Sequence, residues 1–172
     1  MKLTEFFLDQ LETEAAASRK TVERVPTGRA GWKTWKPHEK SMEMGYLATL
    51  VATMPGWIEL MIRRDQLDIA AAESGGFRPP ELSTGGELAT ACESAAAKAR
   101  EALSGATDEF LMTKWKLLVA GRVVDEPIRH RAIRDVFTHM AHHRGQLTVY
   151  LRLNDAKVPS IYGPSADERT FG

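Results

Sequence analysis

The stretch that decides the fold is residues 127–153, which read PIRHRAIRDVFTHMAHHRGQLTVYLRL. Its apolar residues recur at the spacing of one face of a helix, and the set is Ile133, Phe137, Met140, Leu147 and Leu151. Proline is favoured at the first position of a helix, so this helix is predicted to begin at about Pro127 and to end near Leu153. A helix of this length has to pack its apolar face against other helices.

Two further helices are predicted in the first part of the chain. Residues 3–25 carry apolar side chains with a period close to 3.6 and are followed by Pro26. The second segment has a wide apolar face from Leu47 to Ile62, as expected for a buried helix. Pro55-Gly56 predicts a kink or short break in it, because proline lacks the amide hydrogen that the helix needs there.

Another helix is predicted from a capping box. Thr84 and Glu87 have the spacing at which each side chain bonds the other's free backbone amide, and the helix should continue to about Leu103. Residues 113–125 are rich in β-branched and apolar side chains around a glycine, which suggests a short β-hairpin or an irregular crossover. The expected fold class is therefore all-α, an antiparallel four-helix bundle with a short hairpin before the last helix. The remaining segments are predicted to be loops at 26–40 and 73–83 and an extended tail at 154–172.

The composition is that of one globular domain covering residues 1–172, with 43% hydrophobic and 27% charged side chains. Lys plus Arg and Asp plus Glu both number 23, and zero net charge disfavours a nucleic-acid-binding surface. No run approaches the ~18 apolar residues of a membrane span, and the first residues do not resemble a signal peptide. We therefore expect a cytoplasmic protein with neither a nucleic acid nor a membrane as partner. Its one cysteine, Cys92, is expected to be a buried apolar residue.

His139 and His143 are the most chemically distinctive pair in the sequence. They are four residues apart and so lie on one face of the predicted helix. Two neutral imidazoles at this spacing form a common half-site for zinc, nickel or iron, which needs a third protein ligand. Asp135 precedes the pair, and Gln146 and Tyr150 continue the polar stripe. Solvated or hydrogen-bonded histidines give the same pattern, so both interpretations stay open.

Six arginines and three acidic residues lie between residues 122 and 152. A solvated surface with intrahelical ion pairs explains them most simply. Alternatively, they favour an anionic substrate near the histidines. Under that hypothesis Arg144 is a candidate pocket group, together with Gln146 and Tyr150.

Two runs, HMAHHRGQLTVYLR at 139–152 and VPSIYGPS at 158–165, resemble the DinB-like (damage-inducible) family. PHEKSM at 37–42 and MPGW at 54–57 are similar to the same family's second helix and the approach to it. The resemblance implies a four-helix bundle, a homodimer, and a divalent metal, commonly nickel or zinc, between the second and last helices. It also implies a metal-dependent hydrolase, or a transferase or isomerase that uses a low-molecular-weight thiol, acting on a small molecule.

The family's metal triad takes one histidine from the second helix and two from the last, and the last two match His139 and His143. At the position of the first histidine this chain has Leu50, which cannot bind a metal. One interpretation is a metal-free, non-catalytic protein, stress-associated or binding an apolar or anionic ligand in the old cavity. Another is a substitute third ligand, either His38 or Glu43. The third is a metal held weakly by two histidines and water.

Overall fold

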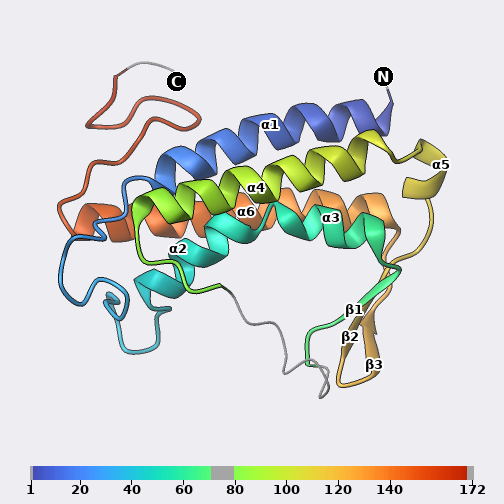
Figure 1. Ribbon diagram of the computed structural model, residues 1–172, viewed down its shortest axis with the longest axis horizontal. Helices are drawn as coiled ribbons and strands as arrows, with labels where there is room; N and C mark the ends of the chain where they lie inside the picture. The colour runs from blue at the N-terminus through green and yellow to red at the C-terminus, as the bar shows by residue number, and fades with distance from the viewer. Residues whose placement is uncertain (1, 71–79, 170–172) are drawn as a thin grey trace.

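The computed structural model describes residues 2–70 and 80–169 (Figure 1). Within this part of the chain the elements are α1 (Leu3–Val22), α2 (Met44–Thr53), α3 (Gly56–Arg63), β1 (Gln66–Asp68), α4 (Gly85–Ser104), α5 (Asp108–Leu111), β2 (Lys116–Val119), β3 (Arg122–Asp125) and α6 (Arg129–Leu153). The fold is mostly helical, as predicted, with a small sheet added. Residues 73–79 of the predicted loop and residues 170–172 of the predicted tail lie outside the described residues.

The helices form the body of the protein. α1 packs against α4 and α6, and both α2 and α3 pack against the same two helices. In Figure 1, α1, α4 and α6 run alongside one another, and the α2–α3 pair runs below α4 and in front of α6. The kink predicted at Pro55-Gly56 is confirmed, since α2 ends at Thr53, α3 begins at Gly56 and their axes differ by 52°. The second predicted helix is therefore two helices, because Pro55 interrupts the backbone ladder.

The helix ends agree with the sequence where a capping pattern is present. α4 begins at the predicted capping box, in which the amide of Glu87 donates to Oγ1 of Thr84 at 3.1 Å. α6 ends at Leu153 as predicted, but it begins at Arg129, two residues after Pro127, because Ile128 is its N-cap. α1 ends at Val22 rather than Val25. Among the described residues no single helix is long and apolar enough to cross a membrane, and the bent α2–α3 pair qualifies only by length and composition.

A mixed three-stranded sheet lies at one end of the helices, in place of the lone hairpin expected from the sequence. β2 and β3 pair antiparallel and turn through Ala120 and Gly121, whose φ angles are 49° and 77°. β1 pairs with β2 in parallel, with Leu67 opposite Leu117. Gln66–Asp68 is too short to be predicted as a strand from its sequence. It is extended because it pairs with β2, and not because its residues favour a strand. Through Leu67 and Leu117 the sheet closes one end of a pocket.

Asp68, the last residue of β1, fastens the turn between β2 and β3. Its carboxylate accepts hydrogen bonds from the backbone amides of Gly121 at 2.6 Å, Ala120 at 3.0 Å and Ala70 at 3.0 Å. These bonds, with that from Gly121 the strongest cause, hold the pKa of the Asp68 carboxyl below its ordinary value. The ionised carboxylate of Asp68 therefore stabilises the folded turn relative to the unfolded chain.

Acid is expected to loosen this turn. Because the folded pKa of Asp68 is depressed, its stabilisation is complete above the unfolded pKa of about 3.9 and is lost as the pH falls through the folded value. We expect hydrogen-exchange protection of Ala120 and Gly121, corrected for intrinsic rates, to be constant above about pH 5 and to fall below about pH 4. Asp68→Ala should remove the protection at every pH. Unchanged protection in this variant at neutral pH would contradict the assignment.

Candidate functional site

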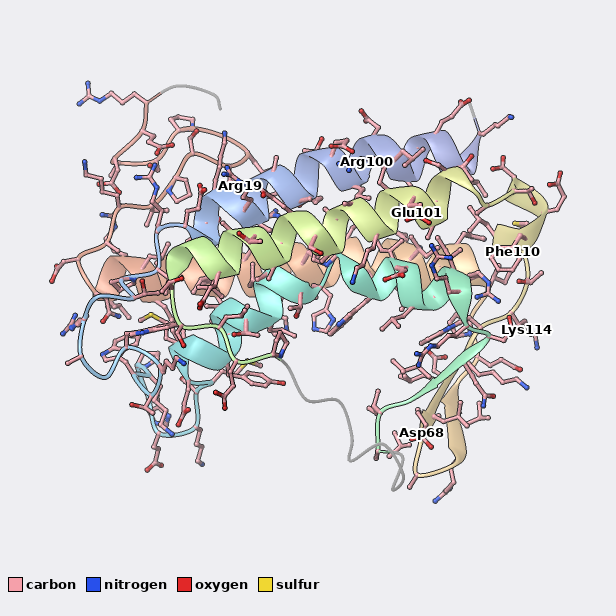
Figure 2. The ribbon with its side chains drawn as sticks, in the orientation of Figure 1. Arg19, Asp68, Arg100, Glu101, Phe110 and Lys114 are labelled. Carbon is pink, nitrogen blue, oxygen red and sulfur yellow. The ribbon has the colours of Figure 1, made fainter. Side chains whose placement is uncertain are left out.

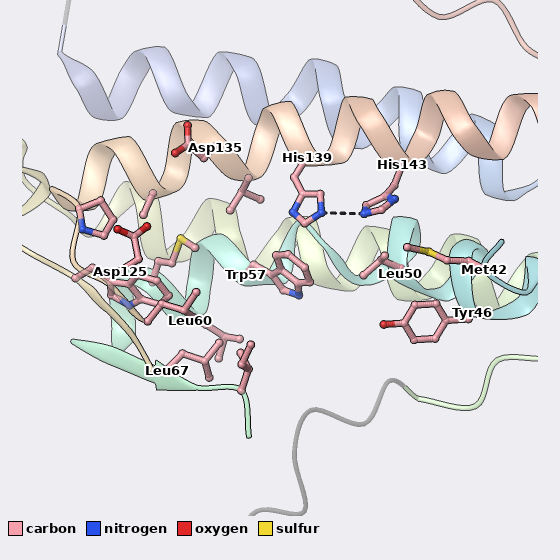
Figure 3. Close-up of a pocket in the computed structure, with 17 residues that line it drawn as sticks. Met42, Tyr46, Leu50, Trp57, Leu60, Leu67, Asp125, Asp135, His139 and His143 are labelled. Carbon is pink, nitrogen blue, oxygen red and sulfur yellow. Dashed lines mark hydrogen bonds between the residues drawn. The ribbon is translucent and has the colours of Figure 1, made fainter. Parts of the chain in front are cut away.

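His139 and His143 lie one turn apart on α6 and project from the same side of the helix (Figure 3). Their Nε2 atoms are 2.8 Å apart and their ring centroids 4.6 Å apart. His143 is buried, whereas His139 is more exposed and touches the edge of Trp57, with 5.4 Å between the ring centroids. The structure thus brings together the pair that the sequence singled out.

A chain of hydrogen bonds fixes which nitrogen of each ring carries the proton. Nδ1 of His143 lies 2.8 Å from Oε1 of Gln146, and an amide oxygen only accepts, so His143 donates from Nδ1. A neutral His143 then accepts at Nε2, and the donor is Nε2 of His139. This arrangement leaves Nδ1 of His139 as a hydrogen-bond acceptor. Gln146, one of the candidate pocket groups, therefore acts by orienting His143.

His139 is held in its neutral form. Burial lowers the pKa of its imidazole, and the neighbouring His143 and His142 lower it further. Near neutral pH Nδ1 of His139 is therefore available to accept a hydrogen bond from another molecule.

The pair lies in the wall of a pocket of about 600 Å³ between α2, α3, α6 and the sheet. In Figure 3 the two rings hang from α6 toward the pocket, and Trp57 and Leu60 of α3 lie across from that helix. The walls are mostly apolar, and they are formed by Met42, Tyr46, Leu50, Trp57, Leu60, Met61, Leu67, Ile69, Trp115, Leu117, Asp125, Pro127, Ala132, Asp135, Val136, His139 and His143.

Leu50 lines the same pocket as both histidines and is 7% exposed. By the resemblance, position 50 is that of the third metal ligand, and the side chain of leucine offers no donor atom. A tetrahedral zinc would hold two nitrogens about 3.4 Å apart, so the His139 and His143 rings would have to separate and break their hydrogen bond. Within residues 2–70 and 80–169 no three His, Cys, Asp or Glu side chains are placed to bind one ion. The donor set does not fit the family's three-ligand site.

The substitute ligands suggested by the sequence lie elsewhere. His38 is in an exposed loop, where its Nδ1 accepts a hydrogen bond from the amide of Lys40 at 3.1 Å. Glu43 is the exposed N-cap residue of α2. Neither is among the residues that line the pocket. Asp135, one helical turn before His139, accepts two hydrogen bonds from the Arg134 guanidinium.

None of the three predicted pocket groups is among the described residues that line the pocket, and Gln146 is linked to it through its hydrogen bond to His143. Arg144 is buried against α1, where its guanidinium donates to Oε2 of Glu14 at 2.6 Å and to the hydroxyl of Tyr162. Tyr150 is buried as well, and its hydroxyl donates to the backbone oxygen of Met42 at 3.0 Å. Consecutive side chains on an α-helix are rotated by about 100° around its axis. Because His143 faces the pocket, its neighbour Arg144 faces another direction.

Arg129 and Arg144 depart from the expected solvated surface because they are buried, whereas the other four arginines of the segment are exposed as expected. Arg129 is 1% exposed and donates to the backbone oxygen of Arg64 at 3.0 Å and to that of Met61, at the end of α3. Its guanidinium also lies 4.3 Å from the centre of the Phe110 ring. Figure 2 shows Phe110 and Lys114 at the same end of the molecule as the sheet. Arg129 thus satisfies backbone oxygens of another helix and is not a binding group for an anionic substrate.

Cys92 is the buried apolar residue expected from the sequence. It is 1% exposed, and burial raises the pKa of its thiol to about 12. A thiolate is the nucleophilic form of cysteine, so Cys92 is not reactive near neutral pH.

Several pocket residues could not be identified from the sequence. In the sequence Trp57 was notable only as part of MPGW, and no sequence pattern indicated its contact with His139. Leu67, Ile69 and Trp115 reach the pocket because β1 pairs with β2, an interaction between segments about 50 residues apart. Asp125 reaches it from the end of β3.

The comparisons with known proteins support the fold. The model of the DinB family matches residues 131–170, which include both histidines of the pair. A DinB-like protein from Bacillus cereus has a similar fold, with a TM-score of 0.67 and 20% identity over 92% of this chain and 97% of that one. A DinB-like protein from Bacillus subtilis, YjoA, has a TM-score of 0.65 and 16% identity over 95% of this chain and 99% of that one. No curated protein sequence matches the chain.

Proposed function

We propose that this chain, which is DinB-like in its last helix and in its overall fold, binds a small, largely apolar molecule beside His139 and His143 without a metal ion. The observation that carries the proposal is Leu50, which lines the pocket that both histidines line. Leu50 puts an apolar side chain at the position where the resemblance implies a metal ligand.

The size and lining of the pocket support this proposal. Sites for small molecules are typically about 300–1,000 Å³, mostly apolar, with few polar groups that orient the ligand. The pocket measures about 600 Å³, and its polar groups include the histidine pair. Nδ1 of His139 accepts a hydrogen bond from the ligand, while Gln146 and His143 hold the ring in the required tautomer.

The alternative is the metal-dependent hydrolase or thiol transferase that the resemblance implies. It needs an ion held by protein ligands with an open coordination position, and among the described residues the pocket is lined by two imidazoles, those of His139 and His143. Elemental analysis of protein purified without a histidine tag separates the two functions. Stoichiometric nickel or zinc that is lost in His143→Ala would support the metal-dependent enzyme and overturn the metal-free proposal.

Ligand binding is tested with phenylbutanol, an apolar molecule with one hydroxyl. We expect saturable one-to-one binding by isothermal titration calorimetry, unchanged by EDTA. Leu60→Trp should weaken binding about tenfold or more, because the added ring occupies the space between α3 and α6.

Val149→Trp is the matched control, because Val149 is 56% exposed on α6 and does not line the pocket. It should bind phenylbutanol as the parent protein does. Equal weakening by the two tryptophans would place the binding elsewhere. Loss of binding on treatment with EDTA would show that a metal takes part.

A further inference from the structure

We infer that the pocket selects a ligand that carries a positively charged amine, and that Asp125 is the group that binds it. This inference rests on the proposed ligand-binding function and adds the chemical class of the ligand. Among the residues that the structure describes, the lining of the pocket includes two carboxylates, Asp125 and Asp135, and no lysine or arginine.

The two carboxylates are not equivalent. Oδ1 of Asp135 accepts hydrogen bonds from Arg134 at 2.7 and 3.0 Å, and in Figure 3 its carboxylate points away from the pocket. Asp125 is exposed on β3 and accepts one hydrogen bond, from the amide of Glu126 at 2.9 Å, and within the part of the chain that the structure describes it has no ion-pair partner. Figure 3 shows its carboxylate pointing from the sheet toward α6. The carboxylate of Asp125 is therefore left to bind a ligand.

The other walls also favour a cation over an anion. Trp57, Trp115 and Tyr46 line the pocket with aromatic rings, whose faces attract ammonium groups. Among the described residues the pocket offers an anion two carboxylates and no lysine or arginine, so its charge disfavours an anion. Arg144 and Arg129, whose charges would compensate an anion, are buried in contacts with other helices.

The test compares three molecules with the same apolar body, namely phenylbutylamine, phenylbutanol and phenylbutyrate. We expect the amine to bind about tenfold more tightly than the alcohol, and phenylbutyrate to bind most weakly. Asp125→Asn should reduce the affinity for the amine to that for the alcohol and leave the alcohol unaffected. Asp135→Asn is the matched control, and it should retain the preference for the amine.

Each outcome bears on a different claim. If the alcohol binds and the amine binds no better, or if Asp125→Asn keeps the preference for the amine, the inference is overturned while the proposed binding function stands. If none of the three molecules binds, the proposed function fails and the inference fails with it. A preference for the amine that weakens as salt is added, in the parent protein and in Asp135→Asn, supports the inference.

Discussion

Replacing Leu50 with histidine is expected to make the pocket bind Ni²⁺ at least about 100-fold more tightly than the parent protein does. The substitution places a third imidazole beside His139 and His143, which already lie with their Nε2 atoms 2.8 Å apart. Two neutral imidazoles bind a divalent ion weakly, whereas three make a site of the kind that holds catalytic zinc. Calorimetric titration of untagged protein with Ni²⁺ near neutral pH measures the difference.

Leu50→Phe is the matched control, since it has a ring of similar reach and no ligand atom. It should bind Ni²⁺ no better than the parent protein. Adding His143→Ala to Leu50→His should abolish the gain, because the new histidine cannot form the site with His139 alone. Equal affinity in Leu50→His and Leu50→Phe would mean that position 50 does not face the pair.

The pair itself was predictable because it depends only on local geometry. Side chains four residues apart on a helix lie next to each other on one face. The period of the apolar residues in 127–153 identified this segment as a helix. The break at Pro55 was predictable for the same reason, because proline cannot donate a backbone hydrogen bond to the preceding turn of the helix. Leu50 was marked by resemblance and then found in the wall of the pocket.

The pocket was not predictable, because its walls come from contacts between distant segments. β1 is three residues long and becomes a strand only by pairing with β2, and this pairing brings Leu67 to the pocket. The role of Arg144 was hidden for a related reason. An arginine in a polar stripe has the pattern of a surface residue, and its burial depends on Glu14, which is 130 residues away.

Arg144→Met is expected to destabilise the protein by about 3–5 kcal/mol. Arg144 and Glu14 are 1% and 4% exposed, and their ion pair joins α6 to α1. Removing the guanidinium leaves the carboxylate of Glu14 buried without its counter-charge, and it also removes a donor to Tyr162. Urea-induced unfolding at neutral pH, with an unchanged dependence on denaturant concentration, measures the loss of unfolding free energy.

The loss of unfolding free energy in Arg144→Met should come from the buried carboxylate of Glu14, which is left without a counter-charge. Two further variants test this cause. Arg152→Met breaks an ion pair to Asp167 in which the arginine side chain is 49% exposed, so it should cost less than about 1 kcal/mol. Combining Arg144→Met with Glu14→Leu removes both buried charges and should recover most of the stability, since an apolar pair can replace a buried ion pair. If the double variant is as unstable as Arg144→Met, the stabilisation comes instead from the bonds of Arg144 to the backbone of Glu14 and to Ser18. Those bonds would then account for how α6 is held with its histidines toward the pocket.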